Sequence, residues 1–271
     1  MIITISRGSF SGGSVVAECV AQQLDYKLVS REILATAAAR YGIAEQRLAE
    51  ALDRAPGLWE RLGHERRLYL VFIQSALLDL VEKDSVVYHG HAGHLLLRGI
   101  SHVLRVRLIA PSVFRMNAAM DRLHCTREAA EAHIQRVDKE RARWTRFLYG
   151  IDWLDPVLYD ITLNLEKFSI EAACDVVVGV MKRPEFEVTE ENRRELADLE
   201  LASHTHARLF LNPKVAAAAT KIDVKAKDGV VHLSGILPGD ALLDDVLETC
   251  RNLPEVKDVR AEWLGAREDR F

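Results

Sequence analysis

The sequence predicts an α/β fold, a mainly parallel sheet with helices on both faces, followed by a small α+β domain at the C-terminus. Short β-branched runs alternate with longer segments whose apolar residues recur at helical spacing, which is typical of βαβ units. A glycine-rich turn, residues 8–14, separates the first run from the first helical segment. Near the C-terminus, Asp228-Gly229 lies between two alternating runs and predicts a β-hairpin.

The elements of the larger part follow one another closely. Strands are expected at residues 2–6, 26–29, 85–89, 103–110 and 159–165. Helices are expected at residues 15–24, 30–39, 90–97, 112–146 and 169–181, with two more between residues 44 and 82. Pro56-Gly57 should separate those two, and Ser30 should cap the helix that follows it. Parallel strands need crossover connections, so this order places helices on both faces of the sheet.

The composition of the chain changes at Lys182. The segment that follows is acidic and helix-prone at first, and residues 184–212 are expected to form a linker helix. Residues 213–265 then show a helix, two strands, a helix and a strand. We therefore expect three parts, residues 1–183, 184–212 and 213–265, and a chain ending near Met181 should fold by itself.

The composition restricts the function classes. Apolar residues make up 49% of the 271 residues and charged residues 28%, which favours a packed core over disorder. The net charge of −4 argues against a nucleic-acid partner. The N-terminus lacks the apolar region of a signal peptide, and the most apolar stretch, residues 68–81, is too short and too polar for a membrane span. We expect a cytoplasmic protein.

The cysteines show no pairing pattern. They are scattered and no two are separated by only two residues: Cys19, Cys125, Cys174 and Cys250. This spacing predicts reduced thiols, without a disulfide framework or a zinc site.

The glycine-rich turn is a candidate phosphate site. Successive backbone N–H groups in such a turn, together with the positive end of the following helix, bind anions. In the P-loop pattern G-x-x-x-x-G-K-[ST], Gly8 and Gly13 take the two glycine positions and Ser14 stands where the lysine is usual. The alternative is a turn that needs glycine only for positive φ.

A basic helical segment is the second candidate. Arg136, Lys139 and Arg143 fall at i, i+3 and i+7, so one helical face carries three positive charges. Phosphoryl transfer needs cations that neutralise charge on the transferred group, and arginine binds phosphate bidentately. The alternative is a solvated helix with internal salt bridges, such as Asp138 with Arg141.

No metal site is assigned from the sequence. His89, His91 and His94 form a cluster at a strand end, but no carboxylate or cysteine lies close in sequence to complete a zinc site. We expect them to line a cleft. Three aspartates could each position magnesium through water, namely Asp79, Asp84 and Asp160.

Taken together, residues 1 to about 181 resemble the cytidylate kinase-like family, relatives of bacterial nucleoside monophosphate kinases. The resemblance is carried by ordered motifs: residues 3–7 with 11–13, residues 31–34, the glycine after the third strand, residues 103–111, Asp138-Lys139-x-Arg141, Asp152-Trp153, and Tyr159-Asp160 with Asn164. It implies a P-loop nucleoside-kinase-like sheet, ATP with Mg²⁺ as the phosphate donor, and a nucleoside monophosphate, CMP or dCMP first, as the acceptor.

The resemblance also implies roles for individual residues. The donor phosphates would be wrapped by Gly8, Ser11, Gly12, Gly13 and Ser14. Arg31 and His91 would lie on the acceptor side, where His91 replaces the family's arginine and makes a fixed charge titratable. The lid would carry Arg136, Lys139 and Arg141 as cations, with Asp138 holding one of them. Ser14 removes the cation that relatives carry in the loop.

Residues 213–265 resemble a BON domain through Ile222-x-Val224, Asp228-Gly229-x-Val231-x-Leu233-x-Gly235 and Val256-x-x-Val259. This resemblance implies ligand or protein contact without catalysis, and an oligomer is compatible with the sequence. The first hypothesis is therefore a nucleotide kinase. The alternative is a catalytically impaired nucleotide sensor or scaffold that signals through its C-terminal domain.

Overall fold

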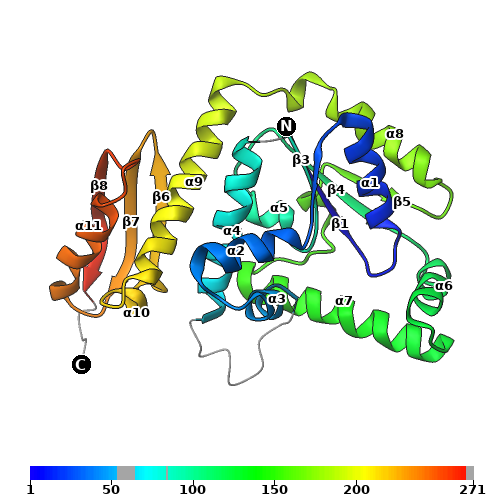
Figure 1. The fold of residues 1–271 in the computed structure, drawn as a ribbon, viewed down its shortest axis with the longest axis horizontal. Helices are drawn as coiled ribbons and strands as arrows, with labels where there is room; N and C mark the ends of the chain where they lie inside the picture. Colours follow the sequence, from blue (N-terminus) through cyan, green and yellow to red (C-terminus); the bar gives the residue numbers. More distant parts are fainter. Residues whose placement is uncertain (54–64, 84, 267–271) are drawn as a thin grey trace.

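The computed structural model describes residues 1–53, 65–83 and 85–266 (Figure 1). The predicted break at Pro56-Gly57 lies outside the described residues, as does the magnesium candidate Asp84. The larger part is built on a parallel sheet of five strands, as the sequence predicted. Their order is β2-β3-β1-β4-β5, with bounds Lys27–Val29, Val86–His89, Ile2–Arg7, Val103–Ile109 and Ile161–Asn164.

Alternate residues of the central strand face two separate apolar cores. Ile3 and Ile5 pack with α1 (Gly13–Leu24) and α8 (Ile170–Met181). Ile2 faces the other side of the sheet and belongs to a larger core, to which the four helices after α1 contribute. These are α2 (Glu32–Tyr41), α3 (Glu45–Asp53), α4 (Glu65–Lys83) and α5 (Gly93–Leu96). Helices thus cover both faces, as expected.

The predicted helix at residues 112–146 is two helices, α6 (Ser112–Leu123) and α7 (Arg127–Tyr149). His124 ends α6 in the left-handed conformation, with φ of 51°. The hydroxyl of Thr126 then caps α7 by accepting a hydrogen bond from the Ala129 N–H. A 3₁₀ turn (Pro156–Leu158) leads into β5, and another (Pro184–Phe186) follows α8.

Ser30 does not cap α2 as predicted. Its backbone N–H and hydroxyl both donate to the Glu32 carboxylate, at 2.7 and 3.2 Å. The Glu32 side chain therefore accepts the hydrogen bonds of a residue that precedes the helix, in place of a cap by Ser30.

The predicted linker helix is α9 (Glu190–Leu211), and it packs on both of its sides. It starts with a capping box of Thr189 and Asn192. Figure 1 shows α9 lying between α4 and the C-terminal sheet, and it contacts both α4 and β6. Side chains such as Leu201 and Phe210 are buried there, so α9 is part of the core.

The C-terminal part is a three-stranded sheet in the order β6-β7-β8. Its strands are Ile222–Lys227, Val230–Leu237 and Asp258–Ala266, with short α10 (Ala216–Ala219) before them and α11 (Leu243–Arg251), after a 3₁₀ turn (Asp240–Leu242), before β8. Asp228 and Gly229 both have positive φ, at 52° and 86°, and join an antiparallel hairpin as predicted. β8 pairs parallel to β7 because α11 crosses over between them.

The prediction of unpaired thiols is wrong for two cysteines. Cys19 of α1 and Cys174 of α8 form a disulfide across a separation of 155 residues, while Cys125 and Cys250 are free. The sequence holds no spacing signal for this pair, because only the packing of α1 against α8 brings the two residues together. Among the described residues, no helix has both the length and the apolar character needed to cross a membrane.

Candidate functional site

A cavity of about 550 Å³ opens at the carboxyl end of β1. The chain places β3 on one side of β1 and β4 on the other, so this end is the topological switch point of the sheet, where α/β proteins bind ligands. The cavity is lined by Arg7, Ser9, Phe10, Ser11, Gly12, Gly13, Ser14, Glu18, Leu28, Ser30, Arg31, Leu34, Leu52, Tyr88, His89, Gly90, His91, Arg122, His133, Val137 and Arg141.

The glycine-rich turn forms one wall of the cavity. Gly12 has φ of 80° and caps α1, so the helix begins at Gly13, two residues before its predicted start. The first helical N–H groups have no carbonyl partner inside their own helix. Here they belong to Gly13, Ser14 and Val15, since the Val16 N–H donates to the Gly12 carbonyl at 3.3 Å. Ser14, the residue aligned with the P-loop lysine, is the second residue of α1 and lines the cavity.

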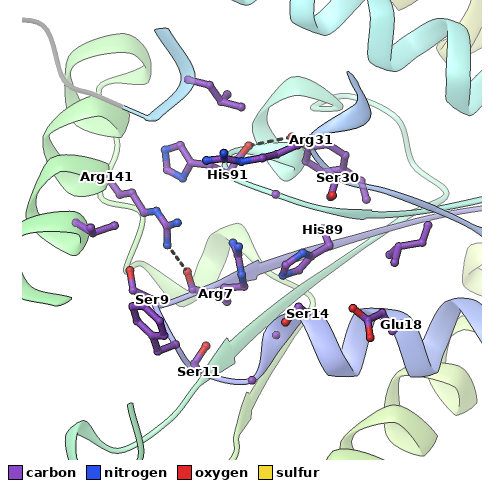
Figure 2. A pocket seen from close by; sticks show the side chains of 18 of the residues that line it. Arg7, Ser9, Ser11, Ser14, Glu18, Ser30, Arg31, His89, His91 and Arg141 are labelled. Carbon is purple, nitrogen blue, oxygen red and sulfur yellow. Dashed lines mark hydrogen bonds between the residues drawn. The ribbon is translucent and has the colours of Figure 1, made fainter. Parts of the chain in front are cut away.

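The lining of the cavity is strongly basic. Its arginines are Arg7, Arg31, Arg122 and Arg141, and its one carboxylate among the described residues is that of Glu18. The whole chain is negative, so this positive charge is local. In Figure 2, Arg31 and His91 lie on one side, Ser11, Ser14 and Glu18 on the other, with Arg7 and His89 between them.

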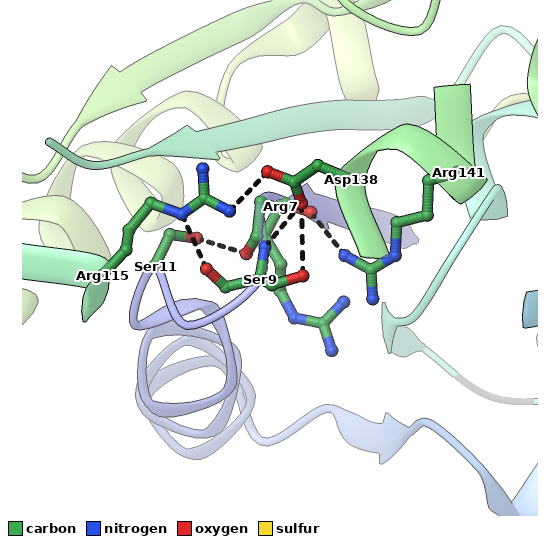
Figure 3. Close-up of polar contacts among 7 residues, drawn as sticks. Arg7, Ser9, Ser11, Arg115, Asp138 and Arg141 are labelled. Carbon is green, nitrogen blue, oxygen red and sulfur yellow. Dashed lines mark hydrogen bonds and ion pairs between the residues drawn. The ribbon is translucent and has the colours of Figure 1, made fainter. Parts of the chain in front are cut away.

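Asp138 holds the loop (Figure 3). Its carboxylate accepts hydrogen bonds from the Ser9 N–H at 3.3 Å and the Ser9 hydroxyl at 3.2 Å. The Arg115 guanidinium of α6 donates to Asp138 at 2.5 Å and to the Ser9 carbonyl at 2.7 Å. The partner of Asp138 is therefore Arg115 rather than Arg141, which donates instead to the Arg7 carbonyl at 3.2 Å.

Gly8 leaves room for this network. A Cβ at Gly8 would lie 3.1 Å from the Arg115 Cζ. A side chain at this position would force the Arg115 guanidinium to shift by a few tenths of an ångström.

The predicted lid cations divide into two groups. Arg141 lines the cavity. Arg136 and Lys139 are exposed on α7 and do not line it, and Arg136 lies 3.9 Å from Glu140 as an i, i+4 pair. Their role over bound phosphates stays a prediction. The basic face of α7 is largely solvated, the alternative that the sequence left open.

Two histidines of the cavity, His89 and His91, have lowered pKa values. Burial, followed by the charges of Arg7 and Arg141, lowers the pKa of His89 to about 3. Burial and then Arg141 hold the pKa of His91 well below its ordinary value. The prediction that His91 is a titratable charge is therefore wrong, because arginines and packed rings surround it; its ring meets Trp144 edge-on at 4.6 Å. The Nε2 atoms of both histidines are buried with no hydrogen-bond partner.

The three magnesium candidates lie elsewhere or outside the described residues. Asp79 forms an ion pair with Arg40 and a contact with His204, joining α2, α4 and α9. Asp160 binds the Arg105 guanidinium with both oxygens, at 2.6 and 3.1 Å.

Four residues at the site were missed as candidates. Arg7, Glu18 and Arg122 line the cavity, and Arg115 binds the loop. The position of Arg7, directly after the first strand and before the glycine turn, was a usable signal. Arg115 and Arg122 carried none, because α6 reaches the loop only through tertiary packing.

Comparison with known proteins agrees with this architecture. The model of the Cytidylate kinase-like family matches residues 2–167. "Cytidylate kinase" of Sulfolobus acidocaldarius is 29% identical over 186 residues, covering 68% of this chain and 95% of that protein. "Cytidylate kinase" of Methanosarcina mazei is 26% identical over 190 residues, covering 66% of this chain and 99% of that protein.

A solved structure shares the fold. An uncharacterized protein from Eubacterium ventriosum superposes with a TM-score of 0.50 at 21% identity, over 68% of this chain and 99% of that one. The family match extends over more than half of the sequence and contains the five-stranded sheet, the glycine turn and all the residues that line the cavity. This chain belongs to the cytidylate kinase-like family.

Proposed function

We propose that this protein is a nucleoside monophosphate kinase, which transfers the γ-phosphoryl group of ATP to an acceptor such as CMP or dCMP. The observation that carries the proposal is the basic cavity at the switch point of the sheet, in a chain of this family. Two relatives bear the name cytidylate kinase, which makes CMP the first acceptor to test.

The residues present fit a bound triphosphate. Phosphoryl transfer depends mainly on positioning and on neutralising charge on the phosphoryl oxygens. The backbone N–H groups of Gly13 and Ser14 would bind donor phosphates at the helix N-terminus. Arg141, held by its hydrogen bond to the Arg7 carbonyl at the end of β1, would neutralise the transferred group. Arg31 would bind the phosphate of the acceptor, on the side that it shares with His91.

Magnesium would bind on α1. Mg²⁺ prefers oxygen ligands and keeps several waters, with substrate phosphates as further ligands. The Ser14 hydroxyl and the Glu18 carboxylate are one turn apart on α1, and both line the cavity. The ion would supply further neutralisation of phosphate charge.

The C-terminal sheet would act as a BON-like module that binds a ligand or protein and regulates the kinase part. Its contact with α9, which also packs on α4, gives it a mechanical connection to the larger part. Nucleotide binding without turnover would favour the alternative, a sensor.

The test is a turnover assay with MgATP and a panel of nucleoside monophosphates. We expect phosphoryl transfer to at least one pyrimidine monophosphate. Arg141→Ala should lower kcat/KM by about 10-fold to 100-fold, as for loss of a charge-assisted contact of about 1.5–3 kcal/mol. Arg146→Ala is the matched control, since Arg146 is exposed on the same helix and does not line the cavity. Equal losses in both variants, or no transfer to any acceptor, would contradict the proposal.

A further inference from the structure

The side chain of Arg7 occupies the space in front of the first residue of α1. Arg7 is the last residue of β1, and Gly13 is the first of α1. A Cβ at Gly13 would lie only 2.5 Å from the Arg7 Cδ, 3.1 Å from its Cβ and 3.3 Å from its Cγ. The first of these distances is too short for a contact between two carbons, and the other two are tight. Arg7 therefore lies across the start of the helix, where a side chain at residue 13 would project.

The charge of Arg7 lies inside the cavity. Arg7 lines the cavity together with His89 and His91, and its charge contributes to the lowered pKa of both rings. In Figure 2 the side chain stands between Arg141 and His89, above the glycine turn. The Arg7 carbonyl also accepts the hydrogen bond from Arg141, which fixes the second cation beside the first.

The glycine turn itself has no cationic side chain, since residues 8–14 are Gly, Ser, Phe, Ser, Gly, Gly and Ser. We propose that Arg7 supplies from the strand end the positive charge that a P-loop lysine supplies from the loop, and that residue 13 is glycine because Arg7 occupies its side-chain space. The inference rests on the proposed function, because it assigns a residue to the donor phosphates of the same site. Arginine suits this position since its planar fork binds two phosphate oxygens at once.

The positive charge should be transferable from residue 7 to residue 13 if both residues are changed together. A lysine at position 13 would project into the space that Arg7 fills, so Gly13→Lys alone should displace Arg7 and weaken phosphate binding. Removing the arginine side chain at the same time should make room for the lysine. The two substitutions should therefore each be harmful alone and compensate each other together, and Arg7→Met, which keeps the packing without the charge, separates the charge of Arg7 from its packing.

The experiment is calorimetric titration of the full chain with MgATP and, separately, with inorganic tripolyphosphate. Arg7→Met keeps the aliphatic packing on Gly13 and removes only the charge, so it should fold and bind both ligands about 10-fold to 100-fold more weakly. Gly13→Lys should bind as weakly. Arg7→Ala/Gly13→Lys should recover to within about 5-fold of the wild type. Arg98→Ala, an exposed arginine outside the cavity, is the control and should bind as the wild type does.

The outcomes separate this inference from the proposed function. Unchanged binding by Arg7→Met, in a wild-type protein that binds MgATP, overturns the inference and leaves the kinase proposal standing. If the double variant binds MgATP and tripolyphosphate no more tightly than either single variant, the claim that a lysine at residue 13 can replace Arg7 is wrong. Arg7-dependent binding of tripolyphosphate without binding of MgATP supports Arg7 as the phosphate cation and overturns the kinase proposal. A wild type that binds neither ligand overturns both.

Discussion

At the scale of single residues, the site combines fixed positive charge with neutral histidine. Four arginines line the cavity, and the charges of two of them, Arg7 and Arg141, add to burial in keeping His89 and His91 unprotonated. The imidazole rings then offer a polar wall that does not repel the arginines. Neither His89 nor His91 therefore adds a charge to the cavity in the physiological pH range.

The neutral histidines predict a loss of stability in acid. Burial followed by nearby arginines lowers the pKa of His89 to about 3 and that of His94 to about 4, from 6.5 in the unfolded chain. Above pH 6.5 both states are unprotonated and these groups contribute no pH dependence. As the pH falls from 6.5 toward 4, the unfolded chain gains protons that the folded one does not. Each histidine should then lower the free energy of unfolding by up to about 1.4 kcal/mol per pH unit.

Urea unfolding between pH 7.5 and pH 4.5 measures this slope. His89→Asn should make the dependence of the unfolding free energy on pH shallower by the contribution of one histidine, whatever the variant does to the stability at pH 7.5. A slope that is the same in the variant and the wild type would show that His89 titrates normally.

At this scale the sequence could predict which residue types belong to the site and which segments of the chain carry them. It placed Ser14, Arg31, His91 and Arg141 at one site, and all four line the cavity. It did not predict that Asp138 binds Ser9 and Arg115, because these contacts join segments more than twenty residues apart. Burial, which decides the charge of His91, is likewise a property of the folded chain.

At the scale of elements, the strands and most helices were predictable from the spacing of apolar residues. That spacing reflects which faces of a strand or helix are buried. The divided helix 112–146 was missed, since its break depends on the left-handed backbone of His124, a residue that the pattern does not single out. The start of α1 was predicted two residues too late because glycine is typical of turns, although Gly13 is helical. Contact with Arg7 explains why a poor helix former occupies that position.

The helical glycines Gly13 and Gly179 give a paired prediction. In α1, a Cβ at Gly13 would overlap Arg7, whereas in α8 a Cβ at Gly179 meets nothing within 4 Å. Gly179→Ala should therefore raise the free energy of unfolding by about 0.5–1 kcal/mol through helix propensity alone. Gly13→Ala should lower it, because the overlap exceeds that gain. Chemical unfolding of the two variants measures both signs, and a stabilising Gly13→Ala would show that Arg7 moves aside freely.

At the scale of the whole molecule, one apolar core crosses the predicted domain boundaries. The cluster on the α4 side of the sheet contains Ile2 and Phe72 of the larger part, Leu201 and Phe210 of α9, and residues of the C-terminal sheet such as Leu233. The sequence indicated three parts because composition changes at Lys182. Composition does not report packing, and α9 buries side chains toward both of its neighbours.

This continuity changes the expected outcome of truncation. A chain ending at Met181 lacks α9, and with it the His204 partner of Asp79, and exposes the face of α4 that α9 covers. We expect it to aggregate or to unfold with little cooperativity. A chain ending at Asn212 keeps α9 and should be more soluble and more stable than the shorter one. Size-exclusion chromatography and thermal unfolding compare the two, and a stable, monomeric chain ending at Met181 would restore the boundary that composition suggested.

The bond between Cys19 and Cys174 also closes a ring in the covalent structure. Residues 20–173 form the circumference of that ring and carry β2 to β5, α6 and α7, while the glycine turn lies just outside it. A protease that cuts once anywhere in this arc opens the ring but releases nothing, since both pieces remain attached through sulfur. Such a nick would be invisible on a non-reducing gel and would appear as two fragments only after a thiol is added.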